Sequence, residues 1–168
     1  MIDNRPIISK KEVIKEFEEY SSLLEEIEKQ FKIDFYGDHG IYHWYSVYKN
    51  TQKLSKYYNI ESKVFKLFSI LHDSKRINED YDLMHGKEAS VYVKQLFDDL
   101  KINLNIEDLN RLIFACANHT KLDKSSYLAN DLIVQICLDS DKLDLARVGI
   151  EPSSKYMLTS YSKTLIFT

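Results

Sequence analysis

The residues of this sequence that could perform chemistry are its histidines and a few aspartates. The chain has five histidines: His39, His43, His72, His85 and His119. His72 ends the most apolar predicted helix and is followed directly by Asp73. Imidazole nitrogen and carboxylate oxygen together suit a borderline or hard divalent metal such as Mn, Fe, Co or Zn. A buried charge at this place would be costly unless a metal or an ion pair offset it. The His72-Asp73 pair is therefore a candidate metal site.

Each of these residues also has an ordinary structural interpretation. A lone histidine in an apolar helix is commonly a hydrogen-bonded core residue, and an aspartate at a helix end is commonly a cap. His39 and His43 are four residues apart, so they are also compatible with neighbouring positions on a helix surface. Cys116 and Cys137 lie in apolar segments, and we expect buried structural residues rather than a disulfide. Only the joint pattern favours a metal site.

Hydrophobic periodicity predicts that helices carry all of these residues, so the expected fold class is all-α. A capping-box pattern at Ser9 begins a predicted helix over about residues 9–31. Further helices are predicted over 39–58, 61–72, 85–100, 106–119 and 130–139, the last continuing after a break through 141–148. The 61–72 helix is apolar on most sides, so we expect it in the middle of a bundle. Residues 73–82 read as a polar loop, and the tail from Lys155 is ambiguous.

Composition excludes several classes of protein. A length of 168 residues fits a single domain. The chain has 23 Lys and Arg against 26 Asp and Glu, a net charge of -3 that argues against non-specific nucleic-acid binding. Four Gly and two Pro are too few for a turn-rich all-β fold. No apolar stretch approaches a membrane span and the N-terminus has no apolar signal region, so we expect a cytoplasmic protein without membrane association. The oligomeric state stays open.

The order of the candidate residues resembles the HD-domain superfamily of metal-dependent phosphohydrolases. Its signature is a His, a His-Asp pair and a distant Asp, which match His43, His72-Asp73 and Asp141, with spacings of 29 (72 minus 43) and 68 (141 minus 73) residues. The flanking segments 39–44, 71–79, 85–86 and 143–150 are similar to those of small, mostly uncharacterised bacterial HD proteins. The resemblance implies a compact, single-domain, multi-helix HD bundle over residues 1–168, with its core at about 36–155.

The same resemblance implies a set of metal ligands. Many superfamily members bind one metal through the four signature residues, and others add two histidines that hold a second metal, with the Asp of the pair bridging. His85 and His119 stand where those two histidines are expected. The implied ligands are then His43, His72, Asp73, His85, His119 and Asp141. One or two divalent ions per chain are expected, with Mg as a further option. Alternatively, His85 is a helix-start residue that orients a substrate oxygen.

A divalent metal makes a hydrolase plausible because it lowers the pKa of bound water towards ~7. The expected function is hydrolysis of a phosphate ester of a small molecule, with a nucleotide as one candidate. Phosphoryl oxygens need cationic partners. We therefore assign catalytic roles to Asp73, Lys75 and Arg76, and substrate-binding roles to His39, Lys121 and Arg147.

These assignments have alternatives too. The cations are also compatible with solvated surface positions or ion pairs, such as Asp144 with Arg147 at i, i+3. Asp82 stands three residues before His85 and is a candidate for orienting its imidazole.

Departures from the superfamily patterns argue against three specific activities. Cyclic-dinucleotide phosphodiesterases carry a second consecutive His where this chain has Thr120, and a Gly-Tyr-Pro element that is absent here. Alarmone hydrolases carry a Glu-Asp pair where this chain has Arg76 and Ile77. Some nucleotide monophosphatases use a Glu shortly after the His-Asp pair, and residues 74–76 contain none.

Two other classes of function remain compatible with the sequence. Some superfamily members use the same six-ligand set to hold two irons and activate oxygen, and a His/Asp set accepts both redox-inert and redox-active metals. A non-catalytic regulatory module that keeps the metal site for stability is the other alternative.

Overall fold

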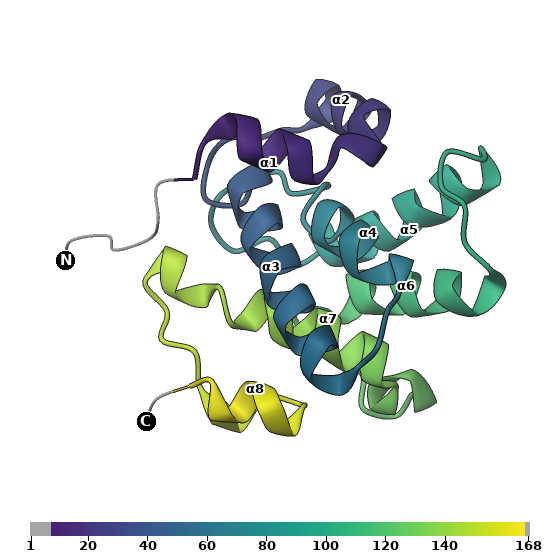
Figure 1. Ribbon diagram of the computed structural model, residues 1–168. Helices are drawn as coiled ribbons and strands as arrows, with labels where there is room; N and C mark the ends of the chain where they lie inside the picture. The colour runs from purple at the N-terminus through teal and green to yellow at the C-terminus, as the bar shows by residue number, and fades with distance from the viewer. Residues whose placement is uncertain (1–7, 167–168) are drawn as a thin grey trace.

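The computed structural model describes residues 8–166, which form an all-helical structure without strands. The eight α-helices of this part of the chain are α1 (Lys10–Glu16), α2 (Ser21–Gln30), α3 (Ile41–Tyr58), α4 (Lys63–Leu71), α5 (His85–Asp98), α6 (Ile106–Asn118), α7 (Leu132–Lys142) and α8 (Ser160–Thr164) (Figure 1). Short 3-10 helices cover Glu18–Tyr20, Tyr127–Asn130, Leu145–Val148 and Ser154–Tyr156. The all-α prediction is confirmed.

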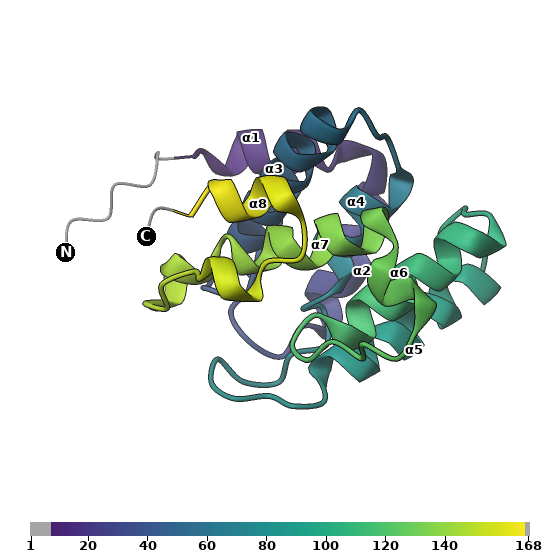
Figure 2. The same cartoon turned by 90° about the horizontal axis from the view of Figure 1, so that it is seen from below.

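Helix α4 is the centre of the bundle, as its apolar sequence predicted. It packs against α3, α6 and α7, and it lies among these helices in both ribbon views (Figure 1, Figure 2). Every residue from Leu67 to Leu71 is buried, and the hydroxyl of Ser69 donates to the carbonyl of Phe65. A helix that is apolar on most sides needs partners on most sides. His72, at its C-terminal end, is therefore delivered into the interior.

Side-chain caps fix where several helices begin. The Ser9 side chain and Glu12 form the capping box of α1 that the sequence indicated. Ser62, Asn105 and Asp131 accept hydrogen bonds from the first backbone N–H groups of α4, α6 and α7. Each cap satisfies donors that a helix start leaves unpaired. The caps place the helix starts within two residues of the predicted positions.

The prediction of a single helix over residues 9–31 is wrong. Helix α1 ends at Glu16, a 3-10 turn follows, and α2 starts at Ser21. Phe17 and Tyr20 leave helical geometry, with φ of -105° and -112°. An uninterrupted helix of this length would extend about 34 Å and carry one end past the core. The break lets Val13 and Phe17 on one side, and Ile27 on the other, be fully buried.

The predicted break near residue 140 is also wrong. Helix α7 runs continuously through Asp139, Ser140 and Asp141, and the helical hydrogen bonding ends only after Lys142. The 3-10 helix Leu145–Val148 then ends at Gly149, whose φ of 76° is the left-handed conformation that glycine adopts readily. Because α7 is unbroken, the Asp141 side chain is carried on a rigid helix beside α3 and α4.

The ambiguous C-terminal tail is held by a buried carboxylate. Asp139 of α7 is fully buried and accepts hydrogen bonds from the backbone N–H of Leu158, the backbone N–H and hydroxyl of Thr159, and the hydroxyl of Ser162. These four donors fasten α8 and the segment before it to the bundle. Charge-assisted bonds of this kind are among the stronger hydrogen bonds in proteins.

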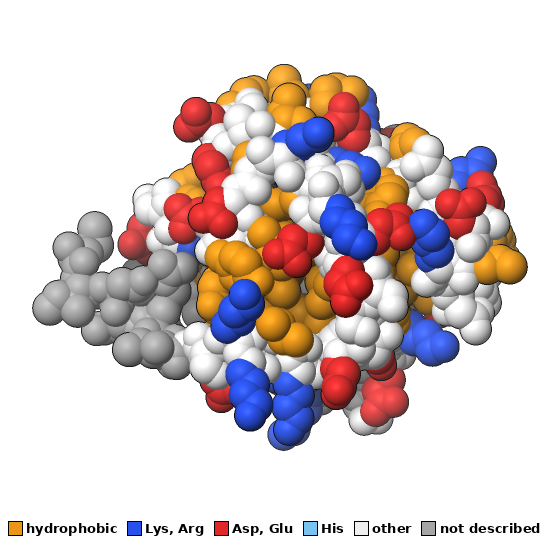
Figure 3. Space-filling view, turned by 90° about the horizontal axis from the view of Figure 1, so that it is seen from above, with side chains coloured by type: hydrophobic (Ala, Val, Ile, Leu, Met, Phe, Trp, Pro, Cys, Tyr) orange, Lys and Arg blue, Asp and Glu red, His pale blue; other side chains and the backbone are white. Residues whose placement is uncertain are grey.

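The outer surface carries both signs of charge. On the face seen from above, acidic, basic and hydrophobic side chains alternate without a large region of one sign (Figure 3). Within residues 8–166, no helix combines the length and the apolar character needed to cross a membrane.

Replacing Asp139 with Asn should destabilise the protein by about 2–4 kcal/mol, because the amide turns its own donor towards buried donors. Thermal or urea unfolding followed by circular dichroism measures the change. The control is Asp98→Asn, an exposed carboxylate near the end of α5, which should shift stability by less than about 0.5 kcal/mol. Equal stability of both variants would show that the tail is not anchored through Asp139.

Candidate metal centre

Five helices deliver the candidate ligands to one buried place. His43 lies on the first turn of α3, and His72 and His119 directly follow α4 and α6. His85 is the first residue of α5, and Asp141 is near the end of α7. All four histidines are at most 5% exposed. The alternative of surface neighbours does not hold for His39 and His43, which are 8% and 2% exposed.

Two glycines allow the starts of α3 and α5 to lie in close contact with neighbouring backbone. A Cβ on Gly40 would lie 2.0 Å from the carbonyl oxygen of Phe35, which accepts the N–H of Ile41 at the start of α3. A Cβ on Gly86 would lie 2.7 Å from the carbonyl oxygen of Cys116 and 3.1 Å from the ring of His119. Glycine at these positions lets the backbones meet. The His85-Gly86 dipeptide therefore brings α5 against the end of α6.

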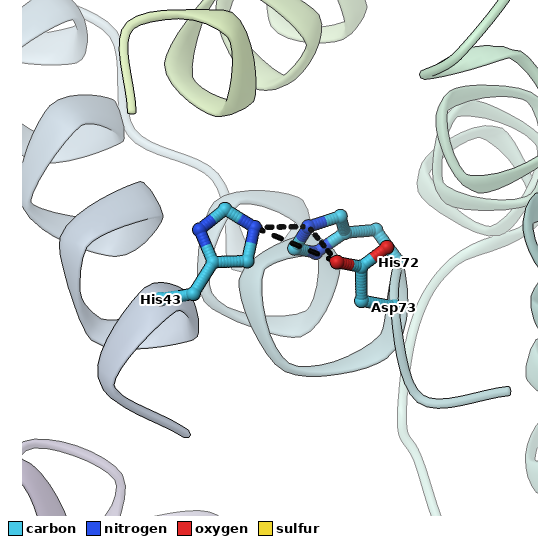
Figure 4. A group of neighbouring side chains, drawn as sticks. All are labelled: His43, His72 and Asp73. Atoms are coloured by element: carbon cyan, nitrogen blue, oxygen red, sulfur yellow. Dashed lines mark hydrogen bonds and ion pairs between the residues drawn. The ribbon is translucent and has the colours of Figure 1, made fainter. Parts of the chain in front are cut away.

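The first ligand group is formed by His43, His72, Asp73 and Asp141. The Nε2 atoms of His43 and His72 are 3.0 Å apart (Figure 4). Asp73 Oδ2 lies 3.6 Å and 3.8 Å from these two nitrogens. Asp141 Oδ1 lies 3.3 Å and 3.6 Å from the same nitrogens. Two imidazoles and two carboxylates thus converge on one point.

The second ligand group uses the other oxygen of the same aspartate. Asp73 Oδ1 lies 3.0 Å from His85 Nε2 and 3.4 Å from His119 Nε2. These two nitrogens are 2.8 Å apart. Asp73 therefore turns one oxygen to each group. His85 is the first residue of α5, as the alternative interpretation expected, and it is also a member of this group.

The hydrogen bonds of the imidazoles show that these groups fit a metal. Each Nδ1 has an acceptor: Asp144 Oδ2 at 2.7 Å from His43, backbone carbonyls at 3.1 Å from His72, Asp82 O at 2.5 Å from His85, and Cys116 O at 2.8 Å from His119. When Nδ1 donates, a neutral imidazole presents a lone pair at Nε2. Two Nε2 lone pairs only about 3 Å apart repel unless a proton or a metal ion lies between them. The donor set can therefore hold divalent metal ions.

The carboxylates of the centre are held in their ionised form. Burial alone would raise the pKa of Asp73, but His72, His119 and His85 beside it outweigh burial and keep this pKa well below its usual range. Burial would likewise raise the pKa of Asp141, and His43 and His72 hold it well below. The ionised carboxylate is the form that binds a metal.

Asp144 is a functional candidate that the sequence reasoning treated only as an ion-pair partner. Its carboxylate orients His43 through the 2.7 Å contact to Nδ1. Burial would lower the pKa of His43, but Asp141 and Asp144 together raise it. Asp144 also forms the expected pair with Arg147, at 3.7 Å. The sequence does hold one indication of this role. Asp144 follows Asp141 by about one helical turn, so its side chain can lie near the same site.

A pocket of about 720 Å³ opens over the two groups. Asp73, His119 and Asp141 lie in its wall. The α4–α5 loop and the α6–α7 connection, which contribute to it, run along the same side of the molecule (Figure 2). The volume is in the range of small-molecule sites. Its other acidic, basic and histidine lining residues are His39, Arg76, Glu79, Asp80, Lys124, Lys142, Arg147 and Lys155.

Three predicted site residues line this pocket beside the ligands. Arg76 is buried, and its Nη1 lies 3.8 Å from Asp73 Oδ1. The Nδ1 of His39 pairs with Glu79 Oε2 at 2.5 Å. The Nε of Arg147 donates to the carbonyl of Asp38, which fixes the guanidinium at the rim. The structure thus brings Arg76, His39 and Arg147 to the same cavity as the candidate ligands.

Two predicted residues do not reach the pocket. Lys75 points to the opposite side, where its Nζ donates to Gln30 Oε1 at 2.6 Å and lies 3.8 Å from the ring centre of Tyr92. Consecutive residues after a helix end point in different directions, so only Arg76 faces the ligands. Lys121 is exposed outside the pocket, and Lys124 lines it instead. The structure therefore gives no support to the catalytic role of Lys75 or the substrate-binding role of Lys121.

Asp82 acts differently from the expectation. Its carbonyl, not its carboxylate, accepts from His85 Nδ1. The carboxylate accepts the backbone N–H groups of Ile77, Met84 and His85, which fastens the loop and the start of α5. Two exposed tyrosines, Tyr81 and Tyr156, form an aromatic rim at the pocket. The sequence did not indicate this rim, because the two residues are far apart in the chain.

Both cysteines are buried and unpaired, as expected. Burial raises the pKa of each thiol. A thiol held in its protonated form is a poor nucleophile and a poor metal ligand. Neither thiol is therefore a candidate ligand, and Cys116 contributes to the centre only through its backbone carbonyl, which accepts from His119 Nδ1.

Comparison with known proteins identifies the fold. A solved structure described as a predicted HD superfamily hydrolase, from an uncultured Thermotogales bacterium, is similar over 95% of this chain and 89% of its own, with a TM-score of 0.61 and 20% identity. No protein-family model matches the sequence, and no curated protein matches it. The chain has the HD-domain fold.

Metal content after dialysis against a buffer that contains phosphate should report on the two groups separately. Asp73→Ala removes an oxygen from both groups and should lose all bound metal. His43→Ala and His85→Ala should each lower the content by about one ion per chain if both groups bind. Elemental analysis of protein purified without chelators measures this.

The matched control is His39→Ala, which removes a buried histidine outside both groups and should leave the content unchanged. An unchanged content in His85→Ala would leave metal only in the first group and make His85 a candidate substrate contact.

Proposed function

We propose that this protein is a metal-dependent phosphohydrolase that acts on a small phosphorylated molecule. The observation that carries the proposal is the fixed guanidinium of Arg76, which lies beside Asp73 at the pocket wall. A cavity that combines a candidate metal centre with several cations suits an anionic phosphoryl group. The similarity to a predicted HD superfamily hydrolase supports the same class of reaction.

In this proposal the ligands would be His43, His72, Asp73 and Asp141 for one ion and Asp73, His85 and His119 for a second. Such an ion supplies activated water near neutral pH and neutralises charge on the phosphoryl group. The metal identity and the number of ions are part of the proposal.

The residues around the centre would bind and orient the ester. Arg76 would contact a phosphoryl oxygen because its guanidinium is already held next to Asp73. Arg147 and Lys142 would add positive charge from the side of α7, although burial lowers the pKa of Lys142. His39, fixed by Glu79, would contact the ester from the start of α3. The apolar and tyrosine-lined rim would receive the organic part of the substrate, for which a nucleotide is a candidate.

The cationic lining favours phosphoryl substrates over the oxygenase alternative. An oxygenase would need two irons and would consume oxygen during turnover, whereas hydrolysis needs neither. A regulatory module would bind metal and phosphate but release no product. The assay below separates these three functions.

Asp73→Asn should reduce hydrolysis by at least roughly 100-fold, because it removes a charged oxygen shared by both groups. Activity is measured as kcat/KM for 4-nitrophenyl phosphate and a panel of nucleoside monophosphates, with Mn²⁺, Co²⁺, Zn²⁺ or Mg²⁺ added. Asp98→Asn is the control and should match the wild type.

Hydrolysis at wild-type rates in Asp73→Asn would contradict the site assignment. Absence of phosphate release by the wild type with every metal would contradict the proposed function. Oxygen uptake by the iron-loaded protein would favour the oxygenase.

A further inference from the structure

The two ligand groups differ in the charges around them. The first group contains the carboxylates of Asp73 and Asp141, and Asp144 lies behind its His43. The second group shares the single carboxylate of Asp73, and its other two members are the imidazoles of His85 and His119. A divalent cation is therefore attracted by more negative charge at the first group than at the second.

Arg76 adds a positive charge beside the second group. Its Nη1 lies 3.4 Å from His85 Nε2, the same nitrogen that would bind a metal. Its Nη2 donates to the carbonyl of Asp80 at 2.6 Å, and its Nε donates to the carbonyl of Asn78. The side chain is 9% exposed. The guanidinium is thus anchored by the α4–α5 loop and cannot lose its proton.

We propose that Arg76 makes the two groups bind metal unequally and couples the weaker one to anion binding. The first group binds a divalent cation by itself. The second group binds one tightly only when a phosphoryl anion also contacts Arg76. This inference rests on the proposed metal centre and adds a regulation of it by the substrate's own phosphate.

The coupling follows from electrostatics. A divalent ion at the second group meets a buried guanidinium a few ångströms away, which should weaken the affinity of that group for the ion by about tenfold or more. An anion that contacts Arg76 offsets that charge and is itself attracted by the metal. The coupling is reciprocal, so the second metal raises phosphate affinity by the same factor. The protein would then complete its metal centre only with a phosphorylated ligand bound.

The test is a titration of metal-free protein with Mn²⁺, with and without inorganic phosphate. Electron paramagnetic resonance counts the free Mn²⁺ at each point. The wild type should show one tight site and a second at least about tenfold weaker, and phosphate should tighten the second site by a similar factor. In Arg76→Gln the two sites should differ by less than about threefold, and phosphate should have little effect.

Two further variants separate the charge from the shape of the side chain. Arg76→Lys keeps the positive charge, so the two groups should still bind Mn²⁺ with unequal affinity. Lys75→Gln removes the neighbouring cation that faces Gln30 and Tyr92, and it should titrate like the wild type. Circular dichroism confirms that each variant is folded.

The outcomes of the Mn²⁺ titration distinguish failure of the Arg76 coupling from failure of the metal centre. Two equal sites in the wild type without phosphate, or an unchanged inequality in Arg76→Gln, would overturn the role of Arg76 and leave the proposed function intact. A wild type that binds no Mn²⁺ would overturn the metal centre and with it the proposed function. A second site that stays weak with phosphate would overturn the coupling.

Discussion

The rest of the structure depends on the arrangement of buried lone pairs around Asp73. Its two oxygens face four imidazole nitrogens, and the Nε2 atoms within each histidine pair lie 3.0 Å and 2.8 Å apart. Carboxylate oxygens and imidazole nitrogens packed this closely in a protein interior need positive charge, from protons or metal ions, between them. A binding site for cations is thus built into the core, and the surrounding helices must keep it in shape.

The candidate ligands lie at or next to the ends of helices rather than in their middles. Histidines at the first or last turn can donate Nδ1–H to backbone carbonyls or to a nearby carboxylate, which fixes each ring. Gly40 and Gly86 permit the close backbone contacts. Asp139 fastens the C-terminal tail through the backbone of Leu158, and Leu158 also lines the pocket. Stability and site geometry are therefore linked through α7.

The sequence predicted the helices, and which candidate ligands come together, better than it predicted the directions of the cationic side chains. Periodicity identified the central helix that ends at His72, because burial on most sides leaves an unbroken apolar pattern. It missed the turn after Phe17, because the apolar spacing continues on both sides of it. Lys75 and Arg76 looked equivalent in sequence, and only the loop conformation sends one to Gln30 and the other to Asp73. Asp144 was recognised as a partner of Arg147 but not of His43, since contacts between distant segments leave little local trace.

The central claim is that Asp73 is shared by two cation-binding groups. The most direct test is anomalous diffraction from crystals of the protein grown with Mn²⁺ and phosphate. We expect two anomalous peaks, one beside His43, His72 and Asp141 and one beside His85 and His119, with a different Asp73 oxygen nearest to each. No peak in the pocket, or a single peak that Asp73 does not contact, would contradict the account.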